Sequence, residues 1–111
     1  LNTKKKVLDI FYQKTLEEMK NLPETTNQRL LNLLVLKAKD AMSRGTIYCR
    51  AEDADLIDSK EFEIRGELEG IGGIIVEGED KIISLDLTYE SLLADIWTDS
   101  VKKLFELLGE N

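Results

Sequence analysis

The sequence has no histidine, one cysteine and one proline among its 111 residues. Without histidine, the chain lacks the commonest general base and the commonest zinc ligand of proteins. The single cysteine, Cys49, excludes an internal disulfide and a thiolate metal site, and it fits a reducing compartment. No apolar run approaches the roughly 20 residues that span a bilayer, and the N-terminus has no signal-peptide pattern. These features predict no catalytic residues, no metal, no cofactor and no direct membrane insertion.

Charge, in contrast, is abundant. Charged residues make up 33% of the chain and hydrophobic residues 42%, which is typical of one soluble globular domain. The formal net charge is −7, and a protein this acidic is repelled by a phosphate backbone, so nucleic acid is not an expected partner. The chain begins with Leu1 rather than Met. We therefore expect a fragment or a processed product.

Two helices are predicted in the N-terminal part of the chain. Residues 3–22 have apolar side chains at steps of three and four, and the stripe consists of Val7, Leu8, Phe11, Tyr12, Thr15, Leu16, Met19 and Leu22. Pro23 ends this helix because it lacks the amide that the helix needs. In the second helix, Thr25 and Gln28 have the spacing of a capping box, and Gly45 is the expected stop. Because the link is short, the two helices are predicted to lie antiparallel.

The periodicity then changes from that of helices to that of strands. Strands are predicted at 46–50, 61–68, 74–77 and 81–87, with one helical turn within 52–58 and a hairpin turn at 78–80. A last helix is predicted at about 89–108, with Thr88 as its N-cap and Gly109 at its end. Its predicted core-facing residues are Leu93, Ile96, Trp97, Val101, Leu104 and Leu108. This order predicts an α+β fold: a two-layer sandwich with two N-terminal helices, a four-stranded mixed sheet covered on one side, and a C-terminal helix.

Three features could carry chemistry, and each has a simpler structural interpretation. Cys49 lies on the apolar face of a predicted strand, which is typical of a buried core thiol. The acids Asp53, Asp55 and Asp58 lack the glycine and the alternating spacing of a calcium loop, so they indicate an acidic loop. Glu77 and Asp86 could form a carboxylate pair, but nothing in the sequence aligns them.

The glycines at Gly70, Gly72 and Gly73 invite comparison with a phosphate-binding loop. A dinucleotide fingerprint needs its third glycine where this chain has Ile75, and it needs a helix to follow. A β-branched strand follows instead. Gly72 and Gly73 are therefore predicted to be structural, permitting a bend or a close backbone approach where the chain enters the sheet.

A family resemblance rests on the stretch from Gly72 to Leu92. A double glycine opens an apolar strand ending in Glu77, a hairpin follows, and Asp-Leu-Thr-Tyr-Glu at 86–90 leads into the last helix. This pattern resembles the C-terminal head domain of the E subunit of the archaeal-type and vacuolar-type rotary ATPases. The Leu-rich second helix and the Glu-Asp-Ala stretch at 52–54 are also similar to that family.

The resemblance implies a mechanical role without catalysis. The E subunit of those ATPases pairs with a long helical partner subunit in the peripheral stalk, and its head docks on the N-terminal region of the non-catalytic nucleotide-binding subunit. Residues 1–22 would then be the tail of a long N-terminal stalk helix and 23–111 the globular head. The complex would lie on the cytoplasmic side of the membrane and couple ATP synthesis or hydrolysis to protons or sodium ions. An alternative of another class is a small ligand-sensing regulatory α/β domain, in which the glycine bend lines a pocket.

A partner surface is predicted on the first helix, because its apolar stripe is too wide for one neighbour. We place the partner-facing side at Val7, Phe11 and Tyr12, and the isolated chain can self-associate through such a patch. The alternative is that the whole stripe is core, since wide stripes are common in buried helices.

Overall fold

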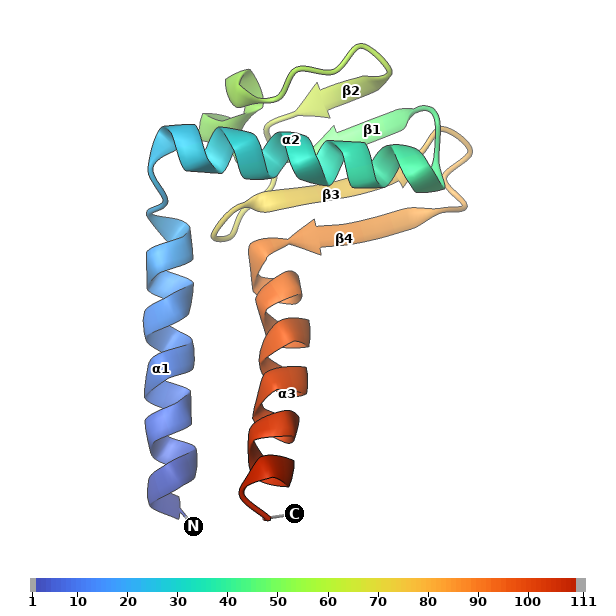
Figure 1. Ribbon diagram of the computed structural model, residues 1–111. Coiled ribbons are helices and arrows are strands. Elements are labelled where there is room, and N and C mark those ends of the chain that lie inside the picture. The colour runs from blue at the N-terminus through green and yellow to red at the C-terminus, as the bar shows by residue number, and fades with distance from the viewer. Residues whose placement is uncertain (1, 110–111) are drawn as a thin grey trace.

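The computed structural model describes residues 2–109, which form an elongated molecule of 49 × 28 × 20 Å. Three α-helices, one 3-10 helix and four strands follow one another in the predicted order (Figure 1). They are α1 (Asn2–Lys20), α2 (Glu24–Ala41), β1 (Gly45–Tyr48), η1 (Ala51–Leu56), β2 (Phe62–Arg65), β3 (Gly73–Gly78), β4 (Ser84–Thr88) and α3 (Tyr89–Leu107). The predicted α+β class and the predicted helix and strand order are confirmed.

The four strands form one mixed sheet in the order β2-β1-β3-β4. β1 is parallel to β2 and antiparallel to β3, and β3 is antiparallel to β4. α2 lies across one face of this sheet (Figure 1). On that face Ile47 stands opposite Val76, and both are fully buried. The opposite face carries exposed or half-buried groups such as Glu63 and Glu77, so the prediction of a sheet covered on one side is confirmed.

The core lies between α2 and the sheet. Its fully buried members include Leu31 and Ala38 of α2, Ile74 of β3 and Cys49 after β1. η1 makes the connection between the parallel strands β1 and β2, and it overlaps the helical turn predicted within 52–58. We call α2, η1 and the sheet the sandwich, because together they bury nearly all of this core.

The helices α1 and α3 form a second region, which we call the leg. They lie side by side and antiparallel to each other. Both project from the sandwich, and both lie crosswise to α2 (Figure 1). The prediction that the first two helices lie antiparallel is therefore wrong. The apolar face of α2 is already occupied by the sheet, so the stripe of α1 packs against α3 instead.

The helix ends also correct the sequence analysis. α2 begins at Glu24 with Pro23 as its N-cap, so Thr25 lies inside the first turn and the predicted capping box does not form. The same helix ends at Ala41, and Gly45 begins β1 instead of stopping the helix. There the glycine lies against the backbone of the neighbouring strand, where a side chain would collide with the Glu77 carbonyl. Glycine was thus needed for strand packing rather than for a helix cap.

The start of α3 agrees with the prediction. Thr88 is the N-cap, and its hydroxyl oxygen accepts a hydrogen bond from the backbone N–H of Ser91 at 3.3 Å. The carboxylate of Asp86 in turn accepts bonds from the Thr88 hydroxyl at 2.6 Å and from the Ser91 hydroxyl at 2.7 Å. Gly109 follows the helix with φ of +73°, which is the conformation expected of a terminating glycine.

Only one of the six residues of α3 that were predicted to face the core is buried. Leu93 is buried, but Ile96, Leu104 and Leu108 are exposed. Trp97 and Val101 are half-buried. A stripe buried along its whole length would need α3 to lie along the sheet. The helix instead leaves the sheet after its first turns and has α1 as its neighbour, so most of its apolar stripe is only partly covered.

Candidate functional site

The contact between the two leg helices uses only part of their apolar surface. The ring of Tyr12 meets the ring of Trp97 edge-on, with centroids 5.3 Å apart and planes inclined by 65°. Leu8 and Leu16 on α1, and Val101 on α3, are half-buried at helical spacing from these two rings. This contact line accounts for one stripe on each helix.

Beside this contact line runs a second row of apolar residues, and it is exposed. On α1, Val7 is 44% exposed and Phe11 is 56% exposed. On α3, Ile96 is 63% exposed and Leu104 is 42% exposed. We call these four residues the leg flank.

The flank residues of the two helices lie on the same side of the leg. Val7 precedes Leu8, Phe11 precedes Tyr12, Ile96 precedes Trp97 and Leu104 precedes Phe105. Each flank residue therefore stands one position before a half-buried one. One residue step rotates about 100° around a helix. Two antiparallel helices are related by a two-fold axis perpendicular to the plane that contains both helix axes. A residue one position before the contact line therefore lies on the same side of that plane in both helices. The flank is therefore one continuous surface rather than two separate ones.

The predicted partner residues are thus placed at different positions. Val7 and Phe11 belong to the exposed flank, whereas Tyr12 lies on the contact line against Trp97. None of the seven stripe residues that precede Leu22 is fully buried. Ile96 and Leu104 extend the surface onto α3, where the sequence analysis had expected core. Partner binding by this surface stays a prediction.

The two predicted structural glycines lie where β3 begins. Gly72 has φ of +134° and Gly73 has φ of +84°, a region that favours glycine. A side chain on Gly73 would stand 2.5 Å from the Leu87 carbonyl oxygen, and one on Gly72 would stand 2.6 Å from the ring of Tyr89. The space beside Gly72 is therefore filled by the first residue of α3. This does not suit the alternative of a ligand-sensing domain whose pocket is lined by the glycine bend.

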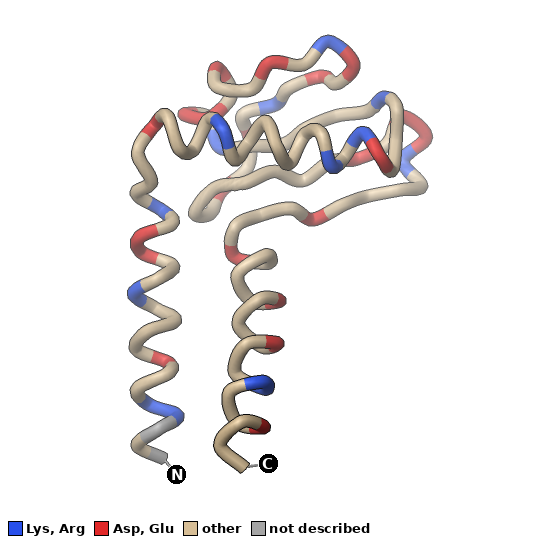
Figure 2. Tube along the Cα trace, viewed as in Figure 1, with Lys and Arg blue, Asp and Glu red and all other residues tan. Residues whose placement is uncertain are grey.

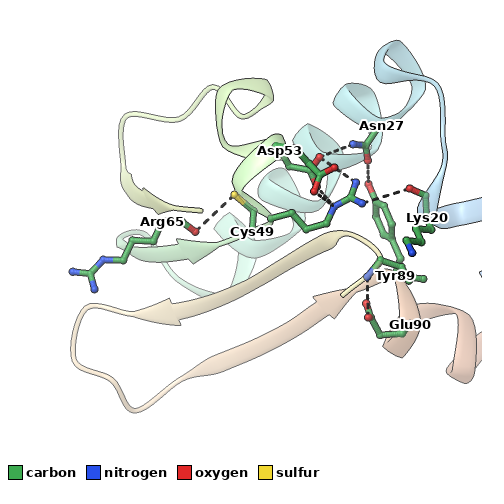
Figure 3. A network of polar contacts seen from close by, with 10 residues as sticks. Lys20, Asn27, Cys49, Asp53, Arg65, Tyr89 and Glu90 are labelled. Carbon is green, nitrogen blue, oxygen red and sulfur yellow. Dashed lines mark hydrogen bonds and ion pairs between the residues drawn. The ribbon is translucent and has the colours of Figure 1, made fainter. Parts of the chain in front are cut away.

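A polar network lies where the leg joins the sandwich (Figure 3). The hydroxyl of Tyr89 donates to Oδ1 of Asn27 at 2.6 Å. The amide of Asn27 donates to Oδ1 of Asp53 at 2.9 Å. The guanidinium of Arg50 donates to Asp53 through Nε at 2.9 Å and through Nη2 at 3.2 Å. We call these four residues the junction network, and they come from α3, α2 and the η1 region.

The junction network is buried and its polar groups are satisfied. Asp53 is 1% exposed, Asn27 is 5% exposed and Tyr89 is fully buried. Among the described side chains that are not exposed, every buried nitrogen or oxygen has a hydrogen-bond partner. Because an unpaired buried charge costs several kcal/mol, the Arg50 guanidinium is what allows Asp53 to lie inside the fold.

The sequence analysis missed this network. It treated Asp53 as part of an acidic loop, and it did not single out Asn27, Arg50 or Tyr89. One signal was available, because Asn27 stands four positions before Leu31 and therefore on the stripe of α2 that is otherwise apolar. A polar residue at a core position indicates a buried partner, although the sequence does not say which one.

The other candidate groups are placed in structural roles. Cys49 is fully buried, and burial, together with the nearby Asp53 charge, raises its pKa to about 11. The prediction of a core thiol is therefore confirmed. Asp86 is held by Thr88 and Ser91, and Glu77 faces Ser84 across the sheet rather than Asp86. Within residues 2–109, no cluster of acids and cysteine has the arrangement of a metal site.

Charges of both signs occur in the sandwich and in the leg (Figure 2). Acidic residues gather along η1 and the loops that flank β2, whereas α1 carries charges of both signs. No helix in the described part of the chain is both long enough and apolar enough to cross a membrane.

Taken together, these features describe a small α+β domain with a two-helix extension. A sequence model of the family described as "ATP synthase (E/31 kDa) subunit" matches residues 1–108. The chain belongs to this family. The resemblance seen at 72–92 is thereby confirmed and extended to nearly the whole sequence.

Individual relatives agree with the family match. The chain is 36% identical over 108 residues to the E subunit of the A-type ATP synthase of Methanocella arvoryzae. It is 31% identical over 109 residues to that of Methanosarcina mazei and 33% identical over 115 residues to that of Methanoregula boonei. Each alignment covers 97% of this chain but only 58%, 58% and 60% of the respective relative. The chain therefore spans somewhat more than half the length of these relatives.

Proposed function

We propose that this chain is the head-bearing part of a peripheral stalk subunit of an A-type ATP synthase. In this role it acts as a non-catalytic stator element, linking the catalytic headpiece to the membrane sector on the cytoplasmic side of the membrane. The coupled ion would be a proton or a sodium ion. The observation that carries the proposal is an exposed apolar flank on a two-helix leg, in a chain of the ATP synthase (E/31 kDa) subunit family.

The division of the chain that the family resemblance implies is part of this proposal. Residues 1–22 are the tail of a long stalk helix, and 23–111 form the head that docks on the N-terminal region of the non-catalytic nucleotide-binding subunit. A stator needs rigid shape rather than reactive groups. Two carboxylates fit this, since Asp53 and Asp86 are committed to internal hydrogen bonds.

The leg flank is proposed as the seat of the long helical partner subunit. Two antiparallel helices that share an apolar surface on one side form a groove into which a third amphipathic helix packs. Such a helix would cover Val7 and Phe11 on α1 together with Ile96 and Leu104 on α3. Without the partner, the same surface would let the isolated chain self-associate, because exposed apolar patches of this kind mark interfaces.

The experiment measures binding of the helical partner subunit by isothermal titration calorimetry. Phe11→Asp and Ile96→Asp each place a charge in the flank, and each should weaken binding roughly tenfold or more. Gln13→Asp and Thr98→Asp are matched controls, because these exposed residues stand one position after Tyr12 and Trp97, on the other side of the leg. The controls should bind as the unmodified chain does.

Thermal melting of each variant alone completes the design. Flank variants that melt as the unmodified chain does but lose the partner support the proposal. Partner binding that survives both flank substitutions, or that is lost equally in the controls, would contradict the placement of the interface. Sedimentation should also show that Phe11→Asp reduces any self-association of the isolated chain.

A further inference from the structure

The C-terminal end of α1 is bonded to a residue far away in the sequence. The last carbonyl groups of a helix have no partner within the helix. At the end of α1, Asn21 supplies two local donors, from its side chain to the Glu17 carbonyl at 3.0 Å and from its backbone to the Glu18 carbonyl at 3.2 Å. The carbonyl of Lys20 instead accepts from Nη1 of Arg50 at 3.5 Å. A cation at this end of a helix is also favoured by the helix dipole.

Arg50 is held in place by groups on both sides of its guanidinium. Asp53 binds it through two donors, and Asp53 is itself fixed by the amide of Asn27. The side chain of Arg50 is only 12% exposed. A rigid planar fork with three engaged nitrogens cannot follow the Lys20 carbonyl if α1 swings away, so the contact has one geometry.

The same residues connect all the elements that meet at the junction. Asn27 lies in the first turn of α2, Tyr89 is the first residue of α3, and Lys20 ends α1. Gly72 lets the Tyr89 ring reach Asn27, because any side chain there would collide with the ring. The link between α1 and α2 is only three residues, 21–23, and it has no regular structure to set an angle.

We propose that Arg50 is a latch that fixes the direction of α1 relative to the sandwich. Its guanidinium donates to the Lys20 carbonyl through one nitrogen and to Asp53 of the junction network through the other two. Opening the latch leaves the contact line with α3 as the remaining hold on α1, so α1 moves more widely about the 21–23 link while the sandwich stays folded. This inference does not rest on the proposed stator role, because it concerns only contacts within the chain.

The peptide bond that the latch holds is itself a trypsin site, Lys20–Asn21, and this permits a local test. Arg50→Lys keeps a positive charge beside Asp53 but loses the planar fork, so it should open the latch, and the rate of cleavage after Lys20 relative to Lys37 separates this from any loss of core stability. In native-state proteolysis followed by mass spectrometry, cleavage after Lys20 should become roughly tenfold faster, which is the effect expected from losing one hydrogen bond to a charged group. Cleavage after Lys37, within α2, measures global unfolding and should change far less.

Two further variants separate a latch from a general loss of stability. Tyr89→Phe removes the far end of the junction network but leaves Arg50 bound to Asp53 and Lys20, so it should not accelerate cleavage after Lys20 relative to Lys37. Arg65→Lys makes the same substitution at an exposed arginine and should have no effect on either site. Spin labels at Gln13→Cys and Glu79→Cys give an independent readout of the angle of α1. Their distance distribution should broaden in Arg50→Lys and stay narrow in Tyr89→Phe.

The proposal is overturned if Arg50→Lys leaves both the cleavage ratio and the distance distribution unchanged. It is equally overturned if Tyr89→Phe has the same effect as Arg50→Lys, since the motion would then follow stability rather than the contact with Lys20.

Discussion

The sandwich covers most of its core residues completely, whereas the leg covers its apolar side chains only in part. Leu31 of α2 is 0% exposed, while Leu104 of α3 is 42% exposed, although both are leucines within helices. The sandwich is two layers thick, so each layer shields the other. Each leg helix has one neighbour, and a helix with a wide apolar stripe needs more than one. The sandwich therefore buries most of its own apolar surface, whereas the leg leaves part of its apolar surface exposed.

The two regions also treat charge differently. The sandwich encloses Asp53 and binds it to Arg50 and Asn27, while charges on the leg are exposed, as in the pair of Lys103 and Asp99 at 3.3 Å. A buried pair that loses one partner is strongly destabilised, but exposed pairs contribute little. Changes in the sandwich should therefore alter stability, and changes in the leg should alter association.

The largest expected effect tests the apolar part of this comparison. Leu31→Ala removes a fully buried side chain from the sandwich and should lower the free energy of unfolding by about 2–5 kcal/mol. Leu104→Ala makes the same change in the leg and should cost less than about 1 kcal/mol. Urea unfolding of the isolated chain measures both. Equal losses would show that the leg is as much a part of the folded core as α2.

The next effect tests how tightly the sandwich is closed where α3 departs. Gly73→Ala places a methyl group 2.5 Å from the Leu87 carbonyl oxygen and 2.7 Å from the Thr88 Cα, at a φ of +84°. Backbone strain alone costs about 1–2 kcal/mol, and displacement of β4 adds to it. We expect a loss of at least about 2 kcal/mol by thermal or urea unfolding.

Gly109 provides the matched control at the end of the leg. It has a similar φ of +73°, but no atom lies within 4 Å of an added side chain. Gly109→Ala should therefore cost no more than about 1 kcal/mol. If Gly73→Ala and Gly109→Ala melt at the same temperature, the chain can relax where β3 begins. Gly73 would then have no special structural role.

The third effect concerns the buried hydroxyl of the junction network. Tyr89→Phe leaves the carbonyl oxygen of Asn27 buried without its donor, which should cost about 1–3 kcal/mol. Tyr12→Phe is the matched change on the contact line between the two leg helices, where the ring still packs against Trp97, and it should cost less than about 0.5 kcal/mol. Chemical denaturation measures the free energy of unfolding of both variants. If Tyr89→Phe leaves it unchanged, the side-chain oxygen of Asn27 finds another donor.

Local signals explain which parts of the fold were predictable. The alternation of Phe62 and Glu63 and the cap at Thr88 each depend on a few neighbouring residues, and each was predicted correctly as structure. The structural role of Gly73 stays a prediction, and its φ of +84° is compatible with it. The direction of α1 was not predicted correctly, because it depends on contacts that Lys20 makes with Arg50 and that Tyr12 makes with Trp97. These pairs lie 30 or more positions apart, so no pattern of neighbouring residues indicates them.

The candidate surface was predictable in part for the same reason. The width of the stripe on α1 indicated an extra neighbour and led to Val7, Phe11 and Tyr12, of which Val7 and Phe11 are exposed. Ile96 was assigned to the core, because the stripe of α3 was assumed to face the sheet. A helical pattern shows that a face is apolar, but it does not show which neighbour covers that face.

The smallest effect depends on pH and belongs to the start of the leg. Hydrogen bonds from the Thr88 hydroxyl, from the Thr88 backbone N–H and from Ser91 lower the pKa of Asp86 below its usual value. A carboxyl group with a lowered folded-state pKa contributes stability above its unfolded pKa, near 4, and loses that contribution as the pH falls through the folded value. Asp86→Asn should therefore lower the melting temperature at pH 7, and the gap from the unmodified chain should close on acidification.

The control for this prediction is Asp99→Asn, which removes only the exposed pair with Lys103 within the leg. It should change the free energy of unfolding by less than about 0.5 kcal/mol at pH 7. The measurement is a series of thermal melts from pH 7 down to pH 3. If the gap between Asp86→Asn and the unmodified chain is the same at both ends of that range, the bonds to Thr88 and Ser91 do not favour the charged carboxylate. The cap of α3 would then owe its stability to the Thr88 hydroxyl alone.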